Sequence, residues 1–159
     1  MTGMKEIKAE YSKLKKKHKD LPELTTFMSV FGFPKEDDVD SVLSLFAFSR
    51  KAPIHLANGM IGFISPTDFI LSQDNKFVKH MKTELMEVLK TCVVLHKTFS
   101  LRAFEATKSE DPEQIMVETI NFVTNELERT LPTVKKALEL SKAGWQDSGT
   151  QTEEVSYNW

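Results

Sequence analysis

The sequence predicts an all-α, multi-helix globular domain built from two packed helical subdomains. Three observations predict this class: apolar residues recur at steps of three and four, helix-capping residues precede several of these stripes, and the β-branched clusters are short and follow a period of 3.6 rather than 2. The chain has 159 residues, 40% of them hydrophobic, which suffices for a buried core. We place the N-terminal subdomain at residues 1–71, the C-terminal subdomain at 72–145, and a polar, flexible tail at 146–159.

The first two predicted helices lie before Gly32. A stripe with steps of three and four predicts a helix over residues 4–18 and consists of Met4, Ile7, Tyr11, Leu14 and His18. Asp20 and Glu23 then stand where a capping residue and the third position of a capping box belong, so a second helix begins there. Gly32 is a typical end for that helix.

Two further helices are predicted on either side of Pro53. Residues 36–38 are all acidic, which suits the positive end of a helix dipole and predicts a helix over 36–49. Pro53 should separate this helix from the next one, over 54–64. A turn or short helix at 67–71 completes the subdomain.

The second subdomain should be centred on one long helix that begins at Asp74 or Asn75 and ends near residue 106. Its apolar stripe has alternating steps of three and four and consists of Val78, Met81, Leu85, Val88, Cys92, Leu95 and Phe99. Asp111 marks the start of the following helix. Pro132 should break or kink that helix, with Thr130 as a new cap, and Gly144 should end it.

Residues 52–71 form the least charged stretch of the chain. They carry a single formal charge, Asp68, and are long enough to span a bilayer. Pro53, Asn58, Gly59 and several later polar residues interrupt the stretch, so we interpret it as a buried helix and a turn. The two glycines of the segment Gly59-Met60-Ile61-Gly62 either let a neighbouring helix approach closely or form a flexible apolar corner that faces a membrane or a partner.

Charge is distributed unevenly along the chain. The formal net charge is −2, yet residues 1–106 contain 16 Lys and Arg against 13 Asp and Glu, whereas residues 107–159 contain 5 against 10. The first 19 residues contain seven Lys and two Glu. This asymmetry predicts separate faces for partners of opposite charge, or head-to-tail association of copies of the chain.

No arrangement of residues in the sequence predicts catalysis. Cys92 is the only cysteine, which excludes an intrachain disulfide and zinc sites built on several cysteines. The four histidines lack the spacing that would cluster metal ligands on one helix face. Cys92 and His96 are one helical turn apart, but Cys92 lies on the main apolar stripe, which favours a core role. We therefore predict no catalytic residue, no metal, no cofactor and no small-molecule substrate.

The basic residues are the main candidates for binding. Each lysine close to an anionic membrane contributes about 1 kcal/mol, although a solvated helix face is the alternative interpretation of such a run. The candidate membrane- or anion-binding residues are Lys13, Lys15, Lys16, Lys17, Lys19, Arg50, Lys51, Lys76, Lys79 and Lys82. His18 and His80 are candidate pH sensors, because protonation near pH 6 would add positive charge to basic regions.

Three short segments in residues 50–78 carry a family resemblance. They are Arg50-Lys51-Ala52-Pro53-Ile54, Gly59-Met60-Ile61-Gly62-Phe63-Ile64 and Lys76-Phe77-Val78. In order, they contain a basic residue before Pro-Ile, an apolar Gly-x-x-Gly-Phe segment, a break and a basic helix with Phe-Val. This order resembles the matrix proteins of orthomyxoviruses, the influenza-like viruses. The thogotovirus type fits better than influenza itself.

The resemblance implies an all-helical N-terminal matrix domain that forms a self-associating layer beneath the viral envelope. It implies contacts with anionic membrane lipid and with viral ribonucleoprotein, and a location in the virion, in the host cytoplasm, at the inner face of the membrane and in the nucleus. This chain departs from the influenza-type domains, which are basic. Its lysines over residues 76–106 are dispersed, so no nuclear-localisation signal is carried over. The alternative function is a cellular helical adaptor or regulator that binds a protein partner through an apolar groove.

Overall fold

The computed structural model describes residues 4–32, 39–65, 76 and 78–150, and the side chains of these residues apart from Met4 and 147–150. All regular structure in these ranges is helical, which confirms the all-α class. The elements are α1 (Met4–Lys17), α2 (Leu24–Phe31), α3 (Val42–Ile64), the short 3-10 helix η1 (Lys79–Met81), α5 (Lys82–Ala106) and α6 (Pro112–Thr150).

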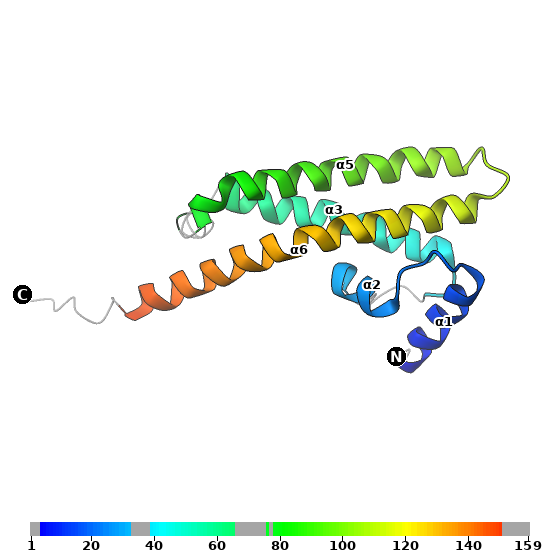
Figure 1. Cartoon of the computed structure of the whole chain (residues 1–159), viewed down its shortest axis with the longest axis horizontal. Coiled ribbons are helices and arrows are strands. Elements are labelled where there is room, and N and C mark those ends of the chain that lie inside the picture. Colours follow the sequence, from blue (N-terminus) through cyan, green and yellow to red (C-terminus); the bar gives the residue numbers. More distant parts are fainter. Residues whose placement is uncertain (1–3, 33–38, 66–75, 77, 151–159) are drawn as a thin grey trace, which may run out of the picture.

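Three long helices, α3, α5 and α6, lie side by side and form the body of the molecule (Figure 1). Helix α5 runs antiparallel to both of the others, and the turn between α5 and α6 lies at one end of this bundle. Helix α2 packs against α6 and α3, and α1 lies beside it. The C-terminal part of α6 extends past the other helices.

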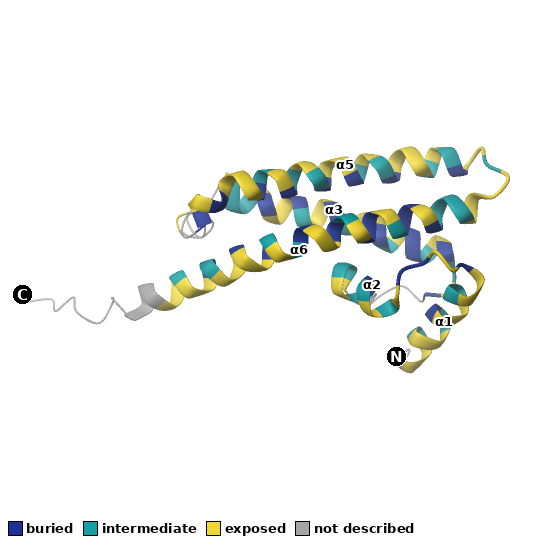
Figure 2. Ribbon diagram, in the orientation of Figure 1, coloured by how far each residue is buried: buried dark blue, intermediate teal, exposed yellow. Residues whose placement is uncertain are grey.

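Side chains from all the long helices meet in one hydrophobic core. Figure 2 shows the buried residues on the sides of α3, α5 and α6 that face one another. The predicted stripe of the long helix is confirmed, because the buried residues of α5 include Leu85, Val88, Cys92, Leu95 and Phe99. Phe99 meets Phe46 of α3 edge to face, with ring centroids 5.0 Å apart.

This core joins the two predicted subdomains. It contains Leu45 and Met60 from the N-terminal range together with Val117 and Ala137 from the C-terminal range. The expected boundary at residue 71 lies outside the described residues. The two ranges are therefore packed through a shared core, and their division into separate subdomains stays a prediction.

The predicted break at Pro53 is wrong, because α3 is one helix from Val42 to Ile64. Proline removes one backbone donor and costs roughly 3 kcal/mol in a helix interior. Burial of Leu45 before Pro53 and of Ala57 after it, on the same core, offsets that cost. Pro53 is itself buried.

The predicted start of this helix is also wrong. Val39 and Asp40 precede the helix, and Ser41 caps it. The Ser41 hydroxyl accepts a hydrogen bond from the backbone N–H of Ser44 at 3.2 Å. The Ser44 hydroxyl accepts one in return from the backbone N–H of Ser41, which completes a capping box. The acidic residues 36–38 lie outside the described residues.

In α6, a break at Pro132, the cap at Thr130 and the end at Gly144 are wrong, because the helix continues through Pro132 to Thr150. The alternative of a kink at Pro132 stays a prediction. The hydroxyl of Thr130 donates to the carbonyl of Leu127 at 2.7 Å, as in a helix interior. Val134, Ala137 and Ser141 are buried beyond the proline, so packing favours continuation of the helix. Residues 146–150 are helical, so the predicted flexible tail is wrong for them, and residues 151–159 lie outside the described part.

Other predicted boundaries have mixed outcomes. Gly32 ends α2 with φ 77°, in the left-handed region that glycine tolerates, which confirms that prediction. The helix α5 begins at Lys82 after η1, and the predicted cap at residues 74–75 and the element at 67–71 lie outside the described residues.

A side-chain carbon at Gly59 would meet nothing within 4 Å, so the close-approach interpretation is wrong there. Of the described helices, none combines the length and apolarity needed to cross a membrane.

Candidate functional site

The lysines of the basic run in and after α1 have two different roles in the structure. Lys15 donates to the carbonyl of Leu21 at 2.5 Å and lies 3.0 Å from a carboxylate oxygen of Glu23, so it holds the end of α1 to the start of α2. Lys13 pairs with Glu10 along α1. Lys16 and Lys19 are exposed. Lys13 and Lys15, which were predicted to bind a membrane or an anion, therefore make contacts that stabilise the local fold.

Lys17 and His18 meet the beginning of α6. The Lys17 ammonium donates to the carboxylate of Glu113. That hydrogen bond holds the pKa of Glu113 below its ordinary value. Desolvation of the carboxylate raises this pKa, whereas the charges of Lys17 and His18 lower it further. His18 is 9% exposed, and its Nε2 lies 3.3 Å from the same carboxylate without the geometry of a hydrogen bond. The candidate pH sensor His18 thus lies at a joint between α1 and α6.

The other predicted basic residues do not converge with α1. Arg50 and Lys51 are exposed on α3. Lys79 and Lys82 are exposed where η1 passes into α5, at the end of the bundle opposite the α5–α6 turn (Figure 1). Lys76 and the second candidate pH sensor, His80, are exposed as well. The predicted basic residues therefore lie on different elements: α1 and the residues after it, α3, and the region where η1 passes into α5.

Helix α5 carries a second stripe, which we call the lysine–apolar stripe. Its members follow one another at steps of four, four, three, four, four, three and four, which keeps them in one line on a helix. They are Lys82, Met86, Lys90, Val93, Lys97, Leu101, Phe104 and Lys108, the last of which lies just beyond the helix. This line lies opposite the core-facing stripe of α5, on the outer side that Figure 2 shows as largely exposed.

Two apolar members of this stripe are more than half exposed to solvent. Leu101 is 59% exposed and Phe104 is 57% exposed, and the neighbouring Val94 is 59% exposed. Large apolar side chains that gather on an exposed face mark interaction sites more often than single ones do. The Lys108 ammonium lies 4.2 Å from the centre of the Phe104 ring, a cation–π contact at the end of the stripe.

Acidic residues flank the stripe but do not enter it. Glu87 pairs with Lys90, and Glu105 pairs with Arg102, each three residues away along the helix. Both carboxylates lie toward one side of the line of lysines and apolar residues. The outer face of α5 is therefore both apolar and basic, a combination that fits a surface with apolar and anionic components.

The sequence interpretation missed this site, because it regarded the lysines over residues 76–106 as dispersed. The signal was the regular spacing of Lys82, Lys90 and Lys97 with the apolar residues between them. Steps of four, four and three repeat every eleven residues and follow the pitch of a helix closely. The predicted core stripe of α5 already places this line on the opposite face of the helix.

Cys92, the residue considered as a nucleophile, lies in the core. Cys92 is fully buried, and burial raises the pKa of its thiol to about 11, so the thiol is protonated at neutral pH. This supports the core role predicted for Cys92. Among the residues that the structure describes, no three His, Cys, Asp or Glu side chains are grouped to hold a metal ion.

Comparison of the chain with protein-family models, with curated proteins and with solved structures found no match.

Proposed function

We propose that the protein is a non-catalytic, matrix-type protein that attaches to an anionic membrane surface and associates with copies of itself. The observation that carries this proposal is the lysine–apolar stripe on the outer face of α5. The resemblance of residues 50–78 to orthomyxovirus matrix proteins supports the same class. A layer beneath a viral envelope, with ribonucleoprotein as a further partner, is the corresponding biological setting.

The stripe is suited to lying flat on a bilayer. From Lys82 to Phe104, within the helix, it extends over about 33 Å at 1.5 Å per residue, so the helix axis would lie along the membrane plane. Leu101, Phe104 and Val93 would enter the boundary between headgroups and acyl chains. The four lysines would each contribute about 1 kcal/mol of attraction to anionic headgroups. Attachment of this kind is peripheral and weakens as salt screens the charges.

Charge asymmetry provides a mechanism for lateral association. The exposed Lys16 and Lys19 lie near one end of the chain, while residues 107–159 carry twice as many acidic as basic residues. Contact between the basic region of one copy and the acidic region of the next joins two different surfaces. Contacts of this type produce rings or open arrays rather than closed dimers, as a layer requires.

A flotation assay tests the membrane proposal. The wild-type protein should float with vesicles of phosphatidylcholine containing about a third phosphatidylserine, and should remain unbound with phosphatidylcholine alone. The double variant Lys90→Glu, Lys97→Glu should bind at least about thirtyfold more weakly, because two attractions of about 1 kcal/mol each become repulsions. The matched control Lys135→Glu, Lys136→Glu changes two exposed lysines of α6 and should bind much more like the wild type.

The outcome also separates the two function classes. An equal loss of vesicle binding in both double variants would show that the net charge of the protein alone governs binding. The lysine–apolar stripe would then not be the membrane-binding surface. No flotation at low salt, together with a monomer in light scattering at all concentrations, would contradict the matrix-type function. That pair of results is what the alternative, an adaptor for a protein partner, predicts.

A further inference from the structure

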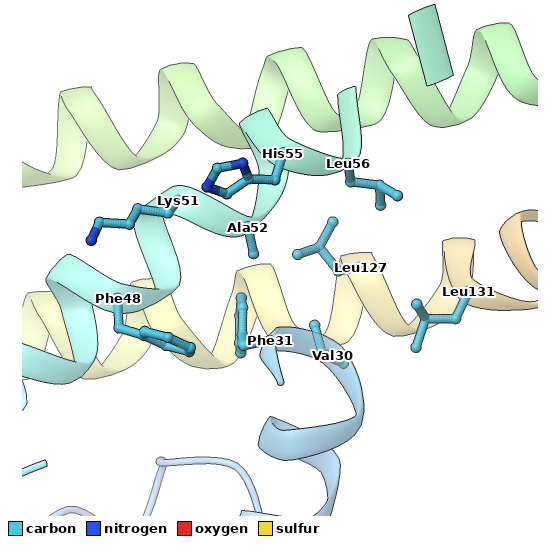
Figure 3. A pocket seen from close by; sticks show the side chains of 9 residues that line it. All are labelled: Val30, Phe31, Phe48, Lys51, Ala52, His55, Leu56, Leu127 and Leu131. Carbon is cyan, nitrogen blue, oxygen red and sulfur yellow. The ribbon is translucent and has the colours of Figure 1, made fainter. Parts of the chain in front are cut away.

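A cavity of about 320 Å³ lies between α2, α3 and α6, away from the stripe on α5 (Figure 3). Three elements contribute to its wall, and the lining residues are Val30, Phe31, Phe48, Lys51, Ala52, His55, Leu56, Leu127 and Leu131. Seven of these nine side chains are apolar. Its volume is near the lower end of the range of about 300–1,000 Å³ that is usual for small-molecule sites.

The apolar wall is held in place by the core. Phe27 is buried and packs against Phe31, with ring centroids 4.7 Å apart, and against Phe48, with centroids 6.1 Å apart. Leu127, on the α6 side, is buried as well. Because core contacts hold these walls, the cavity is formed before a ligand enters, which lowers the entropic cost of binding.

The two polar lining residues lie on one side of the cavity. Lys51 and His55 are one helical turn apart on α3 and are both exposed, and Figure 3 shows them projecting in a similar direction from the helix. The lysine is a cation, and the imidazole can donate a hydrogen bond to an oxyanion. Among the residues that the structure describes, no acidic side chain lines the cavity. The electrostatics therefore favour an anionic group at this edge.

The size of the cavity restricts the apolar part of the ligand. A slender hydrocarbon chain fits between the aromatic wall of Phe31 and Phe48 and the leucines of α6. We propose that this cavity binds a single-chain anionic amphiphile, a medium-chain fatty-acid carboxylate, with the carboxylate at Lys51 and His55 and the chain between Phe31, Phe48 and Leu131. This inference is independent of the membrane-facing stripe.

Calorimetric titration with decanoate, below the concentration at which it forms micelles, tests the proposal on the full chain. The expected result is saturable binding of one molecule per protein. A cationic amphiphile with the same chain, decyltrimethylammonium, should bind at least about tenfold more weakly, because its charge repels Lys51. Uptake without saturation, or equal binding of the two amphiphiles, would overturn the proposal.

Two substitutions test the charge and the location. Lys51→Gln should weaken decanoate binding about tenfold, whereas Lys8→Gln, at an exposed lysine of α1 outside the lining, should leave it unchanged. Ala52→Phe should fill the cavity and abolish binding, with unchanged helical circular dichroism as the check on folding. Equal affinities for wild type, Lys51→Gln and a folded Ala52→Phe would place decanoate elsewhere and refute the site.

A third substitution keeps the proposal testable if Ala52→Phe does not fold. Leu131→Ala enlarges the cavity at its α6 side, so the preference for dodecanoate over decanoate should rise at least about threefold relative to the wild type. An unchanged chain-length preference would show that the hydrocarbon chain does not contact Leu131, and would contradict the proposed binding mode.

Discussion

Phe99 and Phe104 lie five residues apart on α5 and have opposite environments. Phe99 is completely buried and contacts Phe46 edge to face. Phe104 is 57% exposed and contacts Lys108 on the outer face. The same residue type therefore contributes to the core at one position and to the lysine–apolar stripe at the other.

A matched pair of truncations distinguishes these roles. Phe99→Ala should lower the free energy of unfolding by about 3–5 kcal/mol, because it removes buried apolar surface and leaves a cavity. Phe104→Ala should change it by less than about 0.5 kcal/mol, as is usual for an exposed site. Urea denaturation followed by circular dichroism measures both. A large loss for Phe104→Ala would mean that this side chain is packed and that the outer face of α5 is less open than described.

At the scale of elements, Glu113 joins α6 to the end of α1. The hydrogen bond from Lys17 lowers the pKa of Glu113 in the folded state. The ionised carboxylate therefore favours the fold, and this contribution is present above the unfolded-state pKa of about 4.3. It is lost as the pH falls through the lowered pKa of the folded state.

Replacement of the partner tests this joint. Lys17→Met should raise the pKa of Glu113 toward its ordinary value, because the first cause of the lowering is removed. Carboxyl carbon NMR titration measures that shift, and Lys16→Met, at the exposed neighbouring position, provides the control. A titration midpoint of Glu113 that is the same in all three proteins would show that the pair is not formed in solution.

Element boundaries show where sequence reasoning succeeds and where it fails. Gly32 ends α2 as predicted, because the left-handed φ it adopts is a local property of glycine. The sequence predicts that Pro53 separates two helices and that Pro132 breaks or kinks one, yet both prolines lie inside continuous helices. A proline has a local cost of roughly 3 kcal/mol, and the burial of side chains on both sides of it is a tertiary gain that no local pattern reveals.

At the scale of the whole molecule, the single hydrophobic core predicts that the protein unfolds in one cooperative transition. Cys92 lies in that core on α5, and burial with its raised pKa should protect its thiol from alkylation at pH 8. In urea, alkylation of Cys92 and loss of helical circular dichroism should share one midpoint.

A distant substitution tests whether the ranges 1–71 and 72–145 unfold together. Phe27→Ala, in α2, should lower the midpoint of Cys92 alkylation along with that of the helical signal, because both residues belong to the same hydrophobic cluster. If Phe27→Ala lowered only part of the helical signal and left Cys92 protected, the two ranges would be separate subdomains, as the sequence first suggested.

For the candidate binding residues, too, the sequence predicted some features and only the structure showed others. The sequence alone identified the run of lysines in α1 as a candidate binding surface. The structure shows that Lys15 is hydrogen-bonded to the carbonyl of Leu21 and that Lys17 is hydrogen-bonded to the carboxylate of Glu113. Lys97 was regarded as one of several dispersed charges, and it belongs to a continuous line with Leu101 and Lys90. The cavity at Lys51 and His55 has no sequence signature, because its wall combines residues from three helices.

By itself, the sequence determined the helical class, the buried stripe of α5 that contains Cys92, and the asymmetry of charge. These properties depend on neighbours within one or two helical turns, where spacing alone fixes which residues share a face. The tertiary structure decided that helices continue through Pro53 and Pro132 and which lysines are paired. Those outcomes depend on packing between residues that are far apart in the chain, and the free energy of that packing exceeds local preferences.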